Sequence, residues 1–198
     1  MTYYTLSDPC TATLEIKKSQ FLGFGFAIDS REQLMFHVEQ LRNQYPDARH
    51  VCYGYIIGDP HNTTSAGFDD DGEPSGTAGK PILNVLQHKG IGNCVVIVVR
   101  YFGGIKLGAG GLTRAYSSTA QAVVDNMNLH AFVPLSVIMI ETDFANESFV
   151  RHTLDGFNAT ILKVDYGKNV VLTVELAQKS VQVLSEKIGF YGTVKASE

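Results

Sequence analysis

The stretch RYFGGIKLGAGGLTRAYSS, at residues 100–118, is the starting point for predicting the fold, because it connects a predicted strand to a predicted helix. The apolar run NCVVIVV at residues 93–99 precedes it, and a run without alternation is typical of a strand covered on both faces. The segment LTRAYSSTAQAVVDNM at residues 112–127 follows it with helical spacing of its apolar residues. Five glycines lie between these two segments, from position 103 to position 111. The sequence therefore predicts a strand, a glycine-rich turn and a helix.

This layout presents free backbone N–H groups and a helix dipole to an anion. Lys106 and Arg114 add positive charge nearby. Arg114 falls in the first turn of the predicted helix, where a cation is unfavourable unless an anion or a carboxylate offsets it. We expect an anion site here, and the alternative is that the glycines form only a tight corner between strand and helix.

Two familiar phosphate motifs do not fit. Gly108 and Gly110 begin a GxGxxG pattern, but Thr113 occupies its last glycine position. The segment GTAGKP fails as a Walker A loop, since Pro74 stands where the first glycine is needed and Pro81 replaces the Ser or Thr that would hold magnesium. A dinucleotide site and a P-loop are therefore not predicted.

The composition of the 198-residue chain is that of a soluble globular protein, with 44% apolar and 18% charged residues. No apolar run approaches the roughly 20 residues of a membrane span, and no secretory signal pattern is present, so we expect a cytoplasmic protein without membrane contact. The net charge of -4 argues against nonspecific coating of nucleic acid.

The three cysteines, Cys10, Cys52 and Cys94, have no spacing of a disulfide framework or a zinc ribbon. Cys52 and His50 lie on the same face of one predicted strand, which raises the possibility of a nucleophile and its base. A third orienting group is not evident, and a buried structural cysteine is the favoured interpretation.

Periodicity and capping signals predict the earlier elements. Residues 12–28 are predicted to form two strands, and Ser30 with Gln33 forms a capping box that opens a helix. Residues 50–57 form the next predicted strand.

Residues 58–79 lack periodicity and are expected to form one long loop, which in a compact domain is usually functional or disordered. A helix is predicted after it, with Pro81 in its first turn and Gly90 at its end. The acidic part of the loop, DDDGEPSGTAG at residues 69–79, is able to pair with basic residues or to hold a hard cation. A solvated acidic turn is an equal alternative, and metal binding is the least favoured of the three.

The pattern restarts after Pro134 as strand, helix, strand, turn, strand and helix, with a last strand at residues 192–196. That order predicts a small ferredoxin-like domain. Ferredoxin-like sheets often bind RNA, but the basic and aromatic RNP signature is missing here.

Two stretches together resemble the paired signature of the YigZ/IMPACT family: DDGEPSGTAGKPIL at residues 70–83 and VVRYFGGIKLGAGGLTRAYSSTA at residues 98–120. KKSQFLGF at residues 17–24 and PDARHVCYGYIIG at residues 46–58 support the resemblance, which covers roughly residues 12–125.

The resemblance implies an α+β protein of two domains. Residues 1–133 would form an α/β sandwich of the type shared by GHMP-type kinases and domain IV of elongation factor G. Residues 134–198 would form the ferredoxin-like domain. The resemblance also implies a role around translation, since eukaryotic relatives restrain the kinase that answers amino-acid starvation by competing for its ribosome-bound activator.

We therefore expect a cytosolic, non-catalytic regulatory protein of translation, with a pocket for RNA phosphate or a phosphorylated ligand and with the ribosome, RNA or translation factors as partners. No cofactor, metal or catalytic residue is assigned. A phosphotransferase that uses the glycine-rich loop as its phosphate site stays open as the alternative. The expected ligand-binding residues are Asp70, Asp71, Glu73, Gly76, Thr77, Lys80, Arg100, Gly103, Gly104, Lys106, Gly108, Gly110, Gly111 and Arg114.

Overall fold

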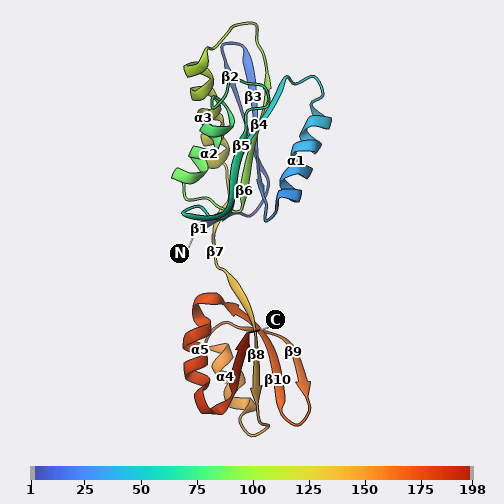
Figure 1. Cartoon of the computed structure of the whole chain (residues 1–198), viewed down its shortest axis with the longest axis vertical. Helices are drawn as coiled ribbons and strands as arrows, with labels where there is room; N and C mark the ends of the chain where they lie inside the picture. The colour runs from blue at the N-terminus through green and yellow to red at the C-terminus, as the bar shows by residue number, and fades with distance from the viewer. Residues whose placement is uncertain (1–2, 197–198) are drawn as a thin grey trace. The chain divides into compact units, whose positions relative to one another are not determined.

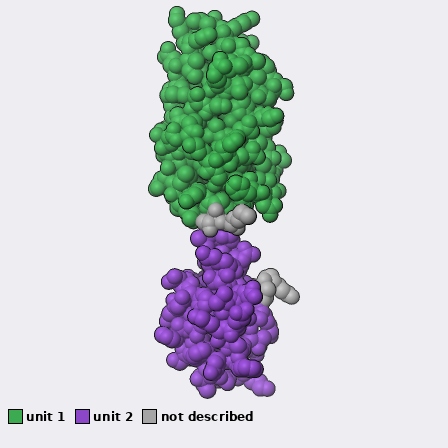
Figure 2. All heavy atoms as spheres, turned by 90° about the vertical axis from the view of Figure 1, so that its left-hand side faces the viewer, with its two compact units in different colours: residues 1–132 green, residues 133–198 purple. Residues whose placement is uncertain are grey.

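The structure is a computed structural model that describes residues 3–196 (Figure 1). The chain separates into two compact units, residues 1–132 and residues 133–198, which Figure 2 shows in green and purple. Each unit has its own hydrophobic core and is described by itself. None of the helices within residues 3–196 is long and apolar enough to cross a membrane.

The first unit is built on a five-stranded antiparallel sheet in the order β2-β3-β6-β4-β5. Helix α1 covers one face of this sheet, and helices α2 and α3 cover the other (Figure 1). The elements are β2 (Cys10–Ile16), β3 (Ser19–Ala27), α1 (Arg31–Gln44), β4 (His50–Asp59), β5 (Asn62–Asp69), α2 (Gly79–His88), β6 (Cys94–Tyr101) and α3 (Ala109–Asp125).

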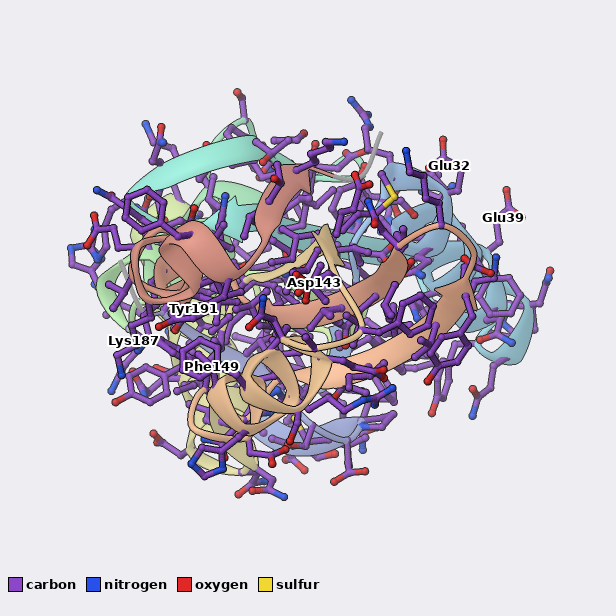
Figure 3. The ribbon with its side chains drawn as sticks, turned by 90° about the horizontal axis from the view of Figure 1, so that it is seen from below. Glu32, Glu39, Asp143, Phe149, Lys187 and Tyr191 are labelled. Atoms are coloured by element: carbon purple, nitrogen blue, oxygen red, sulfur yellow. The ribbon has the colours of Figure 1, made fainter. Side chains whose placement is uncertain are left out.

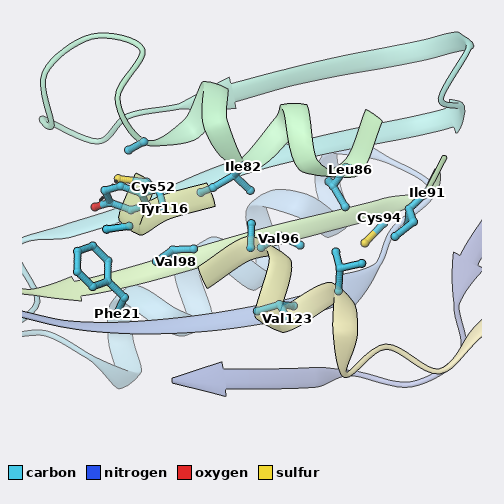
Figure 4. Packing of buried hydrophobic residues seen from close by; sticks show 14 of the residues in the cluster. Phe21, Cys52, Ile82, Leu86, Ile91, Cys94, Val96, Val98, Tyr116 and Val123 are labelled. Carbon is cyan, nitrogen blue, oxygen red and sulfur yellow. Dashed lines mark hydrogen bonds between the residues drawn. The ribbon is translucent and has the colours of Figure 1, made fainter. Parts of the chain in front are cut away.

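Strand β6 is the centre of the sheet and packs on both faces. Its apolar run from Val95 to Val99 is fully buried, because alternate residues enter different cores. Val96 and Val98 pack against α2 and α3, as Figure 4 shows, whereas Val95 and Val99 pack towards α1. The prediction of a strand covered on both faces is confirmed.

Helix α1 begins as its capping signal predicts. The Ser30 side chain accepts a hydrogen bond from the backbone N–H of Gln33 at 3.4 Å. The Gln33 side chain in turn accepts from the N–H of Asp29 at 3.0 Å, one residue before the position that a standard capping box uses. The buried face of α1 carries Leu34, Val38 and Leu41.

The expectation of one long loop over residues 58–79 is wrong in its first half. Residues 62–69 form β5, which pairs antiparallel with β4 at the edge of the sheet. The strand has no apolar alternation because most of its side chains are exposed, so periodicity gives no signal for it. Residues 60–61 form the turn between β4 and β5, and residues 70–78, between β5 and α2, are irregular.

A small two-stranded sheet also lies outside the sequence-based expectations. It pairs β1 (Tyr3–Leu6) with β7 (Leu129–Phe132), and the ring of Tyr3 stacks on that of Phe132 with centroids 4.7 Å apart. The pairing joins the two ends of the first unit, so no local pattern predicts it.

The second unit is ferredoxin-like, as predicted. Its sheet has the order β11-β8-β10-β9 with antiparallel neighbours, and α4 and α5 pack with it around one core. Phe149 of α4 lies against Tyr191, with ring centroids 4.3 Å apart (Figure 3). The elements are β8 (Leu135–Thr142), α4 (Glu147–Asp155), β9 (Thr160–Tyr166), β10 (Val170–Ala177), a 3₁₀ turn (Gln178–Ser180), α5 (Val181–Ile188), a second 3₁₀ turn (Gly189–Tyr191) and β11 (Thr193–Ala196).

Candidate functional site

A cavity of about 320 Å³ lies in the first unit where several chain segments meet. Strand β4 begins there, β6 ends there, α3 begins there, and the irregular segment of residues 70–78 passes beside it. The lining residues are Arg49, His50, Glu73, Pro74, Arg100, Phe102, Lys106, Leu107, Gly108, Ala109 and Leu112.

The N-terminus of α3 is open at this cavity. Its N-cap residue is Gly108, which has a φ of 72°. Because glycine has no side chain, the N-cap residue cannot cap the helix, and the first turn contains no acidic residue. The carbonyl of Gly108 accepts the first helical hydrogen bond, from the N–H of Leu112 at 2.9 Å. The N–H groups before Leu112 therefore have no side-chain cap within the described chain, and the positive end of the helix dipole faces the cavity.

Gly103 shows that part of the glycine cluster does serve the corner. A Cβ on this residue would collide with the backbone carbonyl of Lys18, so only glycine allows the turn after β6 to lie against the β2–β3 turn. At Gly108, in contrast, a Cβ would meet nothing within 4 Å. The two interpretations of the glycines are thus divided between residues: close packing at Gly103, and an uncapped helix start at Gly108.

The N-terminus of α2 is closed by a residue of the chain itself. Asp70 Oδ1 accepts from the N–H groups of Ala78 at 3.0 Å and Gly79 at 2.9 Å, and Oδ2 accepts from Gly76 at 2.7 Å. Thr77 Oγ1 donates to the carbonyl of Pro74 at 2.6 Å. Asp70, Gly76 and Thr77 therefore build the start of α2, and the N–H groups that donate to Asp70 are not free for an external anion.

Asp71 also has an internal role. It has a φ of 40°, and its Oδ2 accepts from the N–H of Val51 at 2.7 Å. Its Oδ1 accepts from Nη2 of Arg42 at 2.9 Å, in an ion pair whose arginine side chain is 46% exposed. The backbone carbonyl of Asp71 faces Nδ1 of His50 at 2.7 Å, and because a carbonyl only accepts, this nitrogen must carry the proton. Asp71 thus fixes the start of β4 and places a proton on Nδ1 of His50.

Glu73 and Arg100 form a buried ion pair at the wall of the cavity. Nη1 of Arg100 donates to Glu73 Oε1 at 2.5 Å, and the two side chains are 7% and 4% exposed, the arginine first. The hydroxyl of Tyr116 donates to the same oxygen at 2.8 Å. The guanidinium carbon lies over two rings, 5.4 Å from the centroid of Phe21 and 5.7 Å from that of Phe102. These contacts hold the arginine in one place.

The donors of Arg100 are only partly used. Nε is buried and has no hydrogen-bond partner within residues 3–196, although the side chain lines the cavity. A buried guanidinium N–H without an acceptor is costly, and native structures rarely leave one unpaired. The arrangement therefore has spare donor capacity beside the open start of α3.

Two further cations complete the cavity. Arg49 and Lys106 line it, and neither makes an ion pair with another described residue. Glu73 is the one acid among the lining residues, and Arg100 already offsets its charge. The net charge of the lining is therefore positive.

Cys52 is not a reactive nucleophile. Burial, as the largest cause, raises the pKa of its thiol far above the ordinary value, and the Sγ–H donates to the carbonyl of Asp70 at 3.0 Å. Burial likewise raises the pKa of the Tyr116 hydroxyl, which lies 3.4 Å from the Cys52 sulfur. The close packing of Cys52 and Tyr116 is visible in Figure 4. The structural interpretation of this cysteine is the one that fits.

Four of the residues expected at the site line the cavity: Glu73, Arg100, Lys106 and Gly108. The others lie next to it in the chain but do not line it: Asp70, Asp71, Gly76, Thr77, Lys80, Gly103, Gly104, Gly110, Gly111 and Arg114. Arg114 is exposed on α3, and its Nη1 lies along its own helix beside Gly110. Within residues 3–196 no group of three or more His, Cys, Asp or Glu residues is placed to hold a metal ion.

Sequence reasoning missed Arg49, the cavity role of His50 and the apolar lining residues. The register of β4 and β6 places His50 directly opposite Arg100. This pairing brings the segment of residues 46–58 to the site. A correct strand order would have been needed to find it.

Comparisons with known proteins agree with this architecture. The family model described as Impact N-terminal domain matches residues 17–124, and that of a domain of unknown function, DUF1949, matches residues 140–189. The chain is 36% identical over 180 residues to IMPACT family member YigZ of Escherichia coli (strain K12), covering 91% of this chain and 88% of that protein.

Two solved structures are also similar. One, described as a hypothetical protein, is 33% identical with a TM-score of 0.73 and covers 100% of this chain and 98% of its own. The other, the two-domain translational regulator Yih1, is 27% identical with a TM-score of 0.35 and covers 62% of this chain and 46% of its own. The family model over more than half of the chain and the full-length relative lead to one conclusion: the chain belongs to the IMPACT family.

Proposed function

We propose that this chain is a non-catalytic regulatory protein of the cytoplasm that acts around translation and binds a phosphate-bearing ligand or RNA phosphate in the cavity of its first domain. The observation that carries the anion site is the unused Nε of Arg100, a side chain only 7% exposed, beside the uncapped N-terminus of α3. We take residues 1–133 and 134–198 as the two domains of this protein.

The chemistry of the lining supports an anion. Guanidinium and ammonium groups bind phosphate oxygens through charge-assisted hydrogen bonds, and a helix N-terminus adds backbone N–H donors and a favourable dipole. Arg100 is pre-organised by Glu73 and two rings, so binding orders little that is not already ordered. Lys106 supplies a charge that no described carboxylate offsets.

Family membership supports the setting in translation. The resemblance implies a role around translation, and one protein compared above, Yih1, is described as a translational regulator. Ribosomes, RNA and translation factors are therefore the partners to be tested. The fold itself is no guide to the activity, because one fold hosts many functions.

A phosphotransferase gains no support from the cavity. Such an enzyme needs a base for the attacking group, and Glu73 is the carboxylate that lines the cavity. Its Oε1 already accepts from both Arg100 and Tyr116. Asp70 and Asp71 are engaged in capping α2 and holding β4.

The test is the binding of inorganic phosphate to the full chain, measured by titration calorimetry. The melting temperature gives a second measurement, at constant ionic strength with chloride as the matched salt. A ligand that binds only the folded state raises the melting temperature. Lys106→Ala should weaken phosphate binding several-fold. Arg114→Ala is the control, because it removes the same charge from the same region but its side chain does not line the cavity.

Two results would overturn the anion site: no binding of inorganic phosphate or of a phosphate monoester to the unaltered chain, or equal binding by the Lys106 and Arg114 variants. Co-sedimentation with purified ribosomal subunits tests the setting separately. Its loss in Lys106→Ala, with retention in Arg114→Ala, would connect the cavity to the partner.

A further inference from the structure

The cavity is more apolar than a pure phosphate site needs. Pro74, Phe102, Leu107 and Leu112 line it together with the cations. Phe102 is 46% exposed, and its ring lies beside the guanidinium of Arg100. Binding is more favourable when an apolar part of the ligand covers this apolar surface and removes it from water.

The donors fit a terminal phosphate better than a phosphate within a nucleic-acid backbone. A phosphate monoester offers three free oxygens and close to two negative charges at neutral pH, whereas a backbone diester offers two oxygens and one charge. Arg100, Lys106 and the start of α3 all line one cavity. Its volume of about 320 Å³ is at the small end of the range of small-molecule sites, roughly 300–1,000 Å³.

The exposed ring of Phe102 beside Arg100 favours a flat group in the ligand. The arginine is held by Glu73 and contacts the rings of Phe21 and Phe102, so its position is fixed before a ligand arrives. The half-exposed ring of Phe102 provides a face on which a planar group can stack.

We propose that the cavity takes a small phosphate monoester whose phosphate is followed directly by a flat or apolar group. This proposal rests on the anion site proposed above and names the class of ligand for it. The phosphate binds Arg100, Lys106 and the N–H groups of α3, and the flat group covers Phe102 and Leu107.

Titration calorimetry on the full chain tests this with four probes: inorganic phosphate, glycerol phosphate, phenyl phosphate and a short RNA oligonucleotide without a terminal phosphate. We expect phenyl phosphate to bind about tenfold more tightly than glycerol phosphate, because the ring is removed from water. The two esters carry the same charge, so the ratio of their affinities isolates the contribution of the flat group.

Variants separate the two parts of the site. Leu107→Ala and Phe102→Leu should lower the ratio of the affinity for phenyl phosphate to the affinity for glycerol phosphate towards one. Ile105→Ala is the matched control, since it is an exposed apolar residue of the same turn, 43% exposed, that does not line the cavity. Lys106→Ala should weaken all three phosphates by the same factor.

The outcomes are distinguishable. If inorganic phosphate and both esters fail to bind, the anion site itself is refuted. If phosphate binds but phenyl phosphate is no tighter than glycerol phosphate, the anion site stands and the ligand class is wrong. If the RNA oligonucleotide binds more tightly than phenyl phosphate and loses its affinity in Lys106→Ala, the cavity binds a nucleic-acid backbone and this inference is overturned.

Discussion

Replacing Glu73 by glutamine tests whether the ion pair with Arg100 organises the cavity. The substitution keeps the size of the side chain and one oxygen acceptor, but it removes the charge that offsets a guanidinium only 7% exposed. Removing one partner of a buried pair costs about 3–5 kcal/mol, because the other charge is left uncompensated.

The structure places the cost near the lower end of that range. The amide oxygen of the new side chain would still accept from Arg100 or Tyr116, and the rings of Phe21 and Phe102 offset part of the arginine charge. We expect the first unit to lose about 3 kcal/mol, which is roughly a hundredfold in its unfolding equilibrium. The double variant Glu73→Gln/Arg100→Met should lose less than the sum of the two single changes, since neither charge is then left alone.

The assay is hydrogen exchange of the backbone amides of β6, read by mass spectrometry, because these amides lie at the centre of the first sheet and report its opening alone. Arg42→Ala is the control: it breaks the partly exposed pair with Asp71, and exposed pairs contribute about 0.2–1 kcal/mol. A loss below about 1 kcal/mol in Glu73→Gln, or strict additivity in the double variant, would refute the role assigned to this pair.

Three further predictions concern other parts of the first unit. Asp70→Ala should lower its unfolding free energy by about 2 kcal/mol, measured by urea titration, because three N–H groups at the start of α2 lose their acceptor. Gly103→Ala should cost more than Gly104→Ala in the same titration, because only at Gly103 would a Cβ collide with backbone. Burial lowers the pKa of His37 below 6.5, so its contribution to stability is present above that pH and is lost as the pH falls through the folded-state pKa. The urea midpoint should therefore fall more between about pH 7.5 and pH 5 for the unaltered chain than for His37→Gln, and equal falls would contradict the assignment.

Elements with local signals could be predicted from the sequence. The apolar run of β6, the cap at Ser30 and the restart after Pro134 each depend on residues close together in the chain, and all three correspond to the structure. Strand β5 could not be predicted because an exposed edge strand carries no apolar period. The β1–β7 pair, which joins Tyr3 to Phe132, depends on contacts that only the finished fold creates.

The candidate site was predicted only in part for the same reason. The sequence shows that Asp70, Asp71 and Glu73 are neighbours, but the turn between them sends each carboxylate to a different partner. Arg49 and His50 reach the cavity through the register of β4 against β6, which pairs His50 with Arg100. The sequence analysis therefore assigned too many residues that are close in the chain to the site, and it missed residues that reach the cavity by pairing across the sheet.

Helices α2 and α3 lie on the same face of the sheet, but the acidic loop of residues 69–79 caps only the start of α2. Its carboxylates cap α2 through Asp70 and offset Arg100 through Glu73, yet none of them is the cap of α3. An acid at a helix start is a common source of stability, typically about 0.3–1 kcal/mol. The first turn of α3 has none and instead carries glycines at positions 110 and 111, which are poor helix formers. Stability alone does not account for this choice, and the phosphate site proposed above would account for it.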